Sequence, residues 1–130
     1  MYQIDLLSRT PVYEQIVEQT EKFVLMGILK PGEQLPSVRS LSVQLSINPN
    51  TIAKAYGELE RRGITVSAAG RGCFIREDIS PVIRQFRGKK LAELDLLIRD
   101  LLKSGLSREE LAAYITRADF VPSPHETEGE

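Results

Sequence analysis

Apolar residues recur at helical spacing along the first part of the chain. Thr10 and Pro11 suit an N-cap and the first position of a helix, where the missing N–H of proline is not needed. The residues from Leu29 to Gly32 then predict a turn. The pattern therefore predicts a first helix between Pro11 and Gly27. Its apolar stripe consists of Ile16, Val17, Thr20, Phe23, Val24 and Leu25.

Two shorter periodic segments follow. Ser37 is an N-cap candidate for a second helix of about two to three turns, with apolar residues at spacings of three and four. Asn48 can cap a third helix, with Pro49 at its first position and Gly63 at its end. Two helices joined by a turn of a few residues predict a helix-turn-helix.

The third helix has two different faces. A buried face is predicted because four apolar residues fall at i, i+3, i+4 and i+7. The opposite face is polar and includes two small residues, so another surface can approach it closely; the alternative is a solvated face without a partner. The apolar set is Ile52, Ala55, Tyr56 and Leu59. The polar residues of the other face are Asn50, Lys54 and Arg61, with Thr51 at its boundary. Its two small residues are Ala53 and Gly57.

A β-hairpin is predicted after the third helix. Residues 64–67 and 73–76 are short strand-like runs, and residues 68–72 between them hold two glycines around one arginine. A hairpin that follows a helix-turn-helix is a wing, so Arg71 would lie at the tip of that wing.

The pattern becomes mainly helical beyond Asp78. A leucine-rich stripe predicts one long amphipathic helix that ends near Gly105, and Ser107 with Glu110 forms the capping box of a last helix. Packing within one chain is the simpler role for this stripe, but a second short helix cannot cover a stripe so wide, which favours dimerisation. The stripe consists of Leu91, Leu94, Leu97, Ile98, Leu101 and Leu102.

These patterns predict a mainly α fold with a small β-hairpin. We expect an N-terminal winged helix-turn-helix DNA-binding domain at residues 1–78 and a short C-terminal helical dimerisation region at 79–120. The polar, proline-rich residues 121–130 are expected to form a disordered tail.

The charge is unevenly distributed along the 130 residues, although the net charge is only -1. Residues 1–36 carry three basic and five acidic groups, residues 37–76 carry six and two, and residues 77–130 carry eight and eleven. A basic centre between acidic flanks favours a surface that meets phosphate groups.

The composition argues against several other classes of protein. One cysteine, Cys73, and one histidine, His125, cannot form an intrachain disulfide or a structural zinc site, so no metal or cofactor is expected. Gly70-Arg71-Gly72 lies between strands and is too short for a phosphate-binding loop, which leaves an enzyme as the weakest alternative. Without a long apolar run or a signal sequence, we expect a cytoplasmic protein that contacts no membrane.

Several side chains have the chemistry of DNA contacts. The amide of Asn50 can bond adenine, Lys54 can donate to guanine or phosphate, and Thr51 can bond either. Arg39 lies at the start of the second helix, where it can hold a phosphate together with free backbone N–H groups, although a surface ion pair is the alternative. Arg71 can enter a minor groove, or it is simply a flexible exposed side chain.

Three motifs in order resemble the GntR signature: PGEQLPSVRSL at 31–41, NPNTIAKAYGELERRG at 48–63 and GRGCFI at 70–75. The chain is identified as a member of this family of transcriptional regulators, and its short helical C-terminal region is similar to that of the YtrA subfamily. The resemblance implies DNA contacts from nine positions. These are Ser37, Arg39, Asn48, Asn50, Thr51, Lys54, Gly70, Arg71 and Gly72. Two positions depart from the pattern, since Pro49 stands where many relatives have arginine and Cys73 where threonine is common.

The resemblance implies a dimeric repressor that binds double-stranded operator DNA and, by analogy, controls an ABC-type transporter operon. About fifty C-terminal residues leave room for at most a modest small-molecule effector pocket at the interface of a homodimer. The alternative from another class is a winged-helix protein-interaction module that does not bind DNA. The positive charge of the central segment argues against it.

Overall fold

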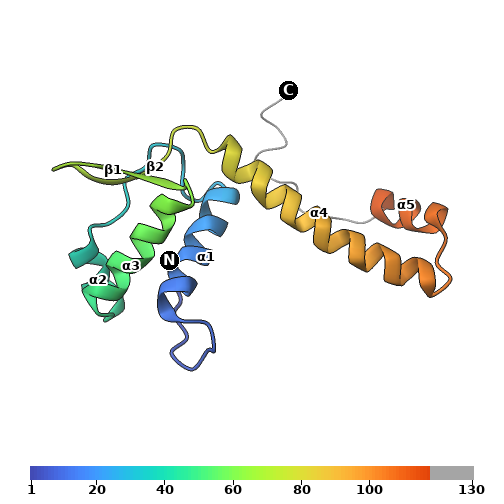
Figure 1. The fold of residues 1–130 in the computed structure, drawn as a ribbon, viewed down its shortest axis with the longest axis horizontal. Helices are drawn as coiled ribbons and strands as arrows, with labels where there is room; N and C mark the ends of the chain where they lie inside the picture. Colours follow the sequence, from blue (N-terminus) through green and yellow to red (C-terminus); the bar gives the residue numbers. More distant parts are fainter. Residues whose placement is uncertain (118–130) are drawn as a thin grey trace. The chain divides into compact units, whose positions relative to one another are not determined.

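The computed structural model describes residues 1–117, and the predicted disordered tail lies outside them. The described residues form two compact units, one from Met1 to Ile79 and one that begins at Ser80 (Figure 1). The first unit holds a helix-turn-helix with a hairpin, and the second holds two helices, so the predicted mainly α fold with a β-hairpin is confirmed. The elements are α1 (Val12–Leu25), α2 (Val38–Leu45), α3 (Pro49–Arg61), β1 (Thr65–Ala68), β2 (Gly72–Ile75), α4 (Ser80–Lys103) and α5 (Arg108–Arg117).

Helix α3 lies at the centre of the first unit, where it packs against α1, α2 and β1. The predicted buried face of α3 is confirmed, since all four of its apolar residues are buried. Removing these side chains from water is the main source of stability for the unit. Its largest fully buried apolar residues are Ile16, Val17, Val24, Leu41, Ile52, Leu59, Ile64 and Ile75.

Local capping sets where the helices begin. The side chain of Ser37 accepts a bond from the backbone N–H of Ser40 (3.0 Å), and that of Asn48 accepts one from Asn50 (2.8 Å), so both predicted caps are confirmed. The predicted cap at Thr10 is wrong, because α1 begins one residue later with Pro11 as its N-cap and no side-chain cap bond.

The side chain of Gln15 explains this start of α1. It is buried, and its amide donates to the carbonyl oxygens of Asp5 (2.9 Å) and Thr10 (2.8 Å), while its oxygen accepts from Asp5 N–H (2.8 Å). The Thr10 carbonyl is therefore engaged by Gln15 rather than by the helix. These bonds tie Asp5 and Thr10 to α1, and Gln19 of α1 binds the backbone of Gln3, an arrangement that the sequence pattern did not predict.

The hairpin forms with strands that differ by one residue from the predicted runs, and Thr65 pairs with Ile75 and Ala68 with Gly72. A segment before α2 extends this pairing, because Gln34 forms an isolated antiparallel bridge with Phe74. Cys73 is half-buried in β2, and burial raises the pKa of its thiol. A thiol with a raised pKa stays protonated near neutral pH, which makes it a poor nucleophile.

The second unit consists of the long helix α4 and the short helix α5. Gly105, at φ +102°, follows the end of α4, and Ser107 accepts a bond from the N–H of Glu110 (3.0 Å), as expected for the cap of α5. Ile98 and Leu102 line a groove of about 500 Å³ between the two helices. The other four residues of the leucine-rich stripe, Leu91, Leu94, Leu97 and Leu101, remain between 40% and 59% exposed.

None of the helices that the structure describes is long and apolar enough to span a lipid bilayer.

Candidate DNA-binding surface

The N-terminal half of α3 presents polar side chains outward because its apolar residues face the core. Asn48 and Asn50 are exposed and Thr51 is partly exposed, while Ile52 is fully buried behind them. The oxygen of the Asn48 side chain is used in capping, which leaves its amide group as a donor. Pro49 has no N–H and starts the helix without loss of a hydrogen bond. This end of α3 is therefore rigid and rich in donors and acceptors.

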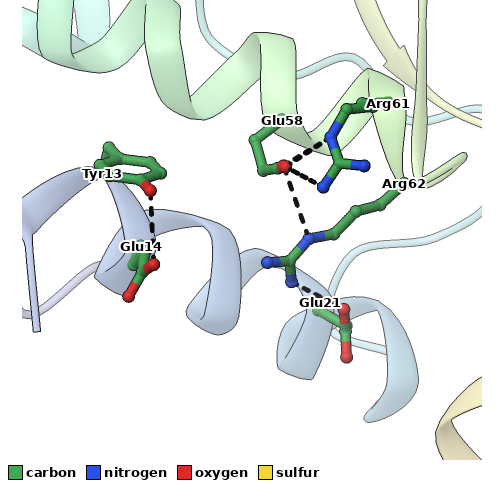
Figure 2. Close-up of polar contacts among 6 residues, drawn as sticks. All are labelled: Tyr13, Glu14, Glu21, Glu58, Arg61 and Arg62. Carbon is green, nitrogen blue, oxygen red and sulfur yellow. Dashed lines mark hydrogen bonds and ion pairs between the residues drawn. The ribbon is translucent and has the colours of Figure 1, made fainter.

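Lys54 lies one turn further along α3 and contacts a residue of α1. Its Nζ is 4.1 Å from the centroid of the Tyr13 ring, which is a cation–π distance. The hydroxyl of Tyr13 donates to the neighbouring Glu14 (3.3 Å), as Figure 2 shows. The ring limits the motion of an otherwise flexible side chain, and the exposed ammonium keeps N–H donors for another partner.

The start of α2 presents Ser37 and Arg39, both exposed. A buried tyrosine fixes the position of this helix end, because the hydroxyl of Tyr56 in α3 donates to the carbonyl of Pro36 (2.7 Å). Burial strongly raises the pKa of Tyr56, so this hydroxyl stays protonated and remains a donor. The free N–H groups at the start of α2 and the guanidinium of Arg39 can together hold an anion.

The tip of the wing places one cation between two glycines. Gly70 and Gly72 have φ angles of +73° and +119°, a region that residues with a Cβ rarely adopt. Arg71 lies exposed between them, and its N–H donates to the carbonyl of Ala68 (2.9 Å) to close the turn. The glycines are needed for the backbone path, and the arginine supplies the charge.

A groove of about 600 Å³ lies between the start of α2, the helix α3 and the wing. It brings together four of the nine predicted contact residues: Ser37, Gly70, Arg71 and Gly72. Ala53 and Gly57 line its α3 side, which leaves that side open for close approach. The other five, Arg39, Asn48, Asn50, Thr51 and Lys54, are not among the residues that line this groove; they lie on α2, at the N-cap of α3 and along α3.

Arg61 was predicted on the free face of α3, but its charge is compensated. Its guanidinium makes a bidentate pair with Glu58, with Nε to Oε1 at 2.7 Å (Figure 2). Hydrogen bonds from Arg61 lower the pKa of the Glu58 carboxyl. Glu58 also lies 4.0 Å from Arg62, which reaches Glu21 of α1 at 3.7 Å. Arg61 is therefore part of an ion-pair network at the end of α3 rather than a free cation.

Tyr13 and the hydroxyl of Tyr56 are the residues of this surface that the sequence pattern did not assign to it. Tyr56 was predicted in the core, but its bond to the Pro36 carbonyl depends on how α3 meets the turn before α2. Tyr13 contacts Lys54 from a helix about forty residues away in sequence. Spacing within one helix carries no signal for either contact.

Comparison with known proteins gives a consistent result. Residues 12–75 match the family model described as bacterial regulatory proteins, gntR family. The HTH-type transcriptional repressor YtrA of Bacillus subtilis (strain 168) is 44% identical over 116 residues, which cover 88% of this chain and 89% of the relative.

Two solved structures are also similar. A transcriptional regulator from Oenococcus oeni has a TM-score of 0.75 at 34% identity and covers 89% of this chain and 97% of its own. The DNA-binding domain of AraR in complex with operator ORX1 has a TM-score of 0.50 at 30% identity and covers 58% of this chain and 92% of its own. The similar proteins are transcriptional regulators rather than enzymes, and these comparisons favour DNA binding over the protein-interaction alternative.

Proposed function

The chain belongs to the GntR family of bacterial regulatory proteins and is a DNA-binding transcriptional regulator, and from this we propose that it is a homodimeric repressor of a transporter operon of the ABC type. The name of the Bacillus subtilis relative, a transcriptional repressor, supports the repressor role. The transporter operon rests on the likeness to the YtrA subfamily, which is an analogy.

We assign the DNA contacts to three elements. The start of α3, with Asn48, Asn50, Thr51 and Lys54, enters the major groove and contacts base edges. Ser37 and Arg39 at the start of α2 bind phosphate. Arg71 enters the adjacent minor groove, whose negative potential attracts an arginine, and Gly70 and Gly72 allow the wing to approach closely. The AraR–operator complex supports a role of this fold in DNA binding, because a DNA-binding domain of similar fold was solved in complex with an operator.

The proposal of a dimer rests on one observation, the exposed leucines of α4. Leu91, Leu94, Leu97 and Leu101 are exposed on one helix, where α5 leaves them uncovered. An apolar stripe of this kind is normally buried, and a second copy of the same helix offers a complementary surface. Two chains would then place two α3 helices in successive major grooves, about 34 Å apart, on a pseudo-palindromic operator.

Footprinting of the purified protein on the promoter region of its own gene tests this function. We expect one protected site with two-fold symmetry, and random DNA of equal length as the control should give weak, uniform protection at low salt. The absence of protection on both DNAs at low salt would contradict DNA binding. Protection of a single asymmetric half-site would contradict the dimer.

Transcript levels in a deletion strain test the direction and target of regulation. Deletion of a repressor should raise transcription of the genes next to the footprinted site, and we expect these genes to include transporter components. A fall in those transcripts would identify an activator. A rise confined to genes without a transporter would reject the proposed target while leaving repression in place.

Within the proposed major-groove contacts, Asn50→Ala should mainly change specificity. Loss of a bidentate amide contact should weaken binding to the operator by about 1–3 kcal/mol and should relax the preference at one base pair of each half-site. Competition between the operator and duplexes with single base changes measures this. An equal loss on operator and random DNA would contradict a base contact from Asn50.

A further inference from the structure

Gln34 links the tip of the wing to the segment that enters α2. Its side-chain amide Nε2 donates to the backbone carbonyl of Arg71 at 2.9 Å, across 37 residues of sequence. The backbone on both sides of Gln34 pairs with β2, since Ile75 N–H donates to the carbonyl of Glu33 (2.8 Å) and Leu35 N–H donates to the carbonyl of Cys73 (2.8 Å). The backbone that carries the side chain of Gln34 is therefore held in place by its hydrogen bonds to β2.

The amide of the exposed Gln34 side chain lies close to the backbone of the tip. A Cβ placed on Gly72 would lie 2.6 Å from Nε2 of Gln34, which is closer than real Cβ contacts. Because Gly72 has no side chain, the amide of Gln34 can occupy the space beside it. Because glycine adopts many backbone conformations, the two glycines around Arg71 would otherwise let the tip change direction. The carbonyl of Arg71 that accepts the bond from Gln34 lies between these two flexible glycines, Gly70 and Gly72.

Gln34 also lies close in sequence to the start of α2. It precedes the N-cap Ser37 by three residues, and the neighbouring Leu35 is 3% exposed and anchors the segment in the core. The groove between α2, α3 and the wing is lined by Gln34, Ser37 and Arg71 together. A single side chain therefore connects the wing tip to the helix end that carries Arg39.

We propose that Gln34 is a positioning residue that holds Arg71 at a fixed orientation relative to the start of α2, so that the wing meets DNA already ordered. This role rests on the proposed function, in which Arg71 enters the minor groove. Order in the free protein reduces the conformational entropy that binding would otherwise lose. Gln34 itself need not touch DNA, and its effect should act through Arg71.

A double-mutant cycle on the whole 130-residue chain tests this role. Gln34→Met keeps the length of the side chain and removes the donor without adding charge. We expect it to weaken binding to the footprinted operator by about three- to tenfold, and by less than about twofold when Arg71→Ala is already present. Gln19→Met is the matched control, because Gln19 Nε2 also donates to a backbone carbonyl, that of Gln3 (2.6 Å), but on α1. The control should change affinity by less than about twofold.

Backbone relaxation measured by NMR on the free protein gives a readout that does not depend on DNA. In Gln34→Met, the amides of Arg71 and Gly72 should become more mobile on the picosecond to nanosecond timescale, while those of α2 and α3 should stay as in the wild type. Unchanged mobility at the tip would overturn the positioning role. Loss of order throughout the unit would also overturn it, because Gln34 would then support the fold rather than the tip.

The operator affinities of the variants distinguish failure of the positioning role of Gln34 from failure of the proposed DNA contact of Arg71. If Arg71→Ala weakens binding and Gln34→Met does not, the positioning role is wrong and the wing contact stands. If the losses of the two variants add in full, Gln34 acts independently of Arg71 and the role is again wrong. If Arg71→Ala leaves affinity unchanged, the proposed wing contact fails, and the positioning role fails with it.

Discussion

The two units of the chain differ in how they bury their apolar residues. In the unit Met1–Ile79, helices α1, α2 and α3 and the hairpin enclose Ile52, Leu59 and other side chains completely. In the unit that begins at Ser80, no residue of the described helix α5 is buried, and Leu94, Leu97 and Leu101 of α4 are between 40% and 59% exposed. Similar apolar stripes therefore end differently, because the first unit buries its stripe in its own core and the second leaves its stripe exposed, as a surface for the proposed partner.

The largest expected effect is on the stability of the first unit. Leu59→Ala removes a fully buried side chain and should lower the free energy of unfolding by about 2–5 kcal/mol, as measured by urea unfolding followed by circular dichroism. Leu97→Ala makes the same chemical change at a residue that is 59% exposed. At concentrations where the chain is monomeric, it should change stability by less than about 0.5 kcal/mol.

The protein concentration sharpens this contrast. If α4 pairs with a second copy, the effect of Leu97→Ala should grow as the concentration rises, whereas that of Leu59→Ala should not. If the two variants lost equal stability at low concentration, the second unit would have a core of its own. That result would contradict the proposed difference between the two units.

The next effect concerns dimerisation. The double change Leu94→Lys with Leu101→Lys should convert a dimer to a monomer in sedimentation velocity and should weaken operator binding about a hundredfold, because binding by two linked modules is lost. Leu96→Lys is a matched control, since Leu96 is 61% exposed but lies on the opposite side of α4. A similar loss of dimer in Leu96→Lys, or an unaltered dimer in the double variant, would place the interface elsewhere.

A smaller effect is expected from the phosphate contacts of the first unit. Arg39→Ala should weaken binding to operator and random DNA by the same factor, and the slope of log affinity against log salt should fall by about 0.9 per chain. Arg117→Ala removes an equally charged, exposed residue from α5 and should leave the slope unchanged. Equal slopes for Arg39→Ala and the wild type would rule out a phosphate contact from Arg39.

The smallest effect is a pH dependence at the end of α3. Arg61 lowers the pKa of Glu58 below its ordinary value of 4.5, so the folded state binds this proton less readily than the unfolded state. The resulting stabilisation is present above that ordinary value and is lost as the pH falls through the lowered pKa. Glu58→Gln should therefore reduce the acid-dependent loss of stability slightly, as measured by thermal unfolding between pH 3 and pH 7. High salt should diminish the difference, because the side chain of Arg61 is 75% exposed and the pair is partly screened by salt. An identical pH profile at low salt would contradict this contribution.

The sequence predicted α3 well because its signals are local. The cap Asn48, the proline at the first position and the four buried residues lie within twelve positions of each other, and each acts within the helix itself. The caps at Ser37 and Ser107 were predictable for the same reason. The nine proposed contact residues came from the motifs, and the structure places four of them around one groove.

The remaining features depend on contacts between elements that are distant in sequence. Gln15 binds the backbone of Asp5 and Thr10, Tyr13 contacts Lys54 across two helices, and Gln34 reaches the carbonyl of Arg71. No periodic pattern identifies these partners, because each pair depends on how α1, α3 and the wing pack together. Arg61 shows the same limit, since its position on α3 was predictable but its pairing with Glu58 required the side-chain conformations.

The most direct test of the central claim is the number of chains bound to one operator. Sedimentation equilibrium of the protein with a duplex that carries a single footprinted site gives the mass of the complex. We predict two chains per duplex for the wild type and loss of this complex for the Leu94→Lys, Leu101→Lys variant at the same concentrations. One chain per duplex, with the affinity of the variant equal to that of the wild type, would contradict an account in which the exposed face of α4 joins two DNA-binding units.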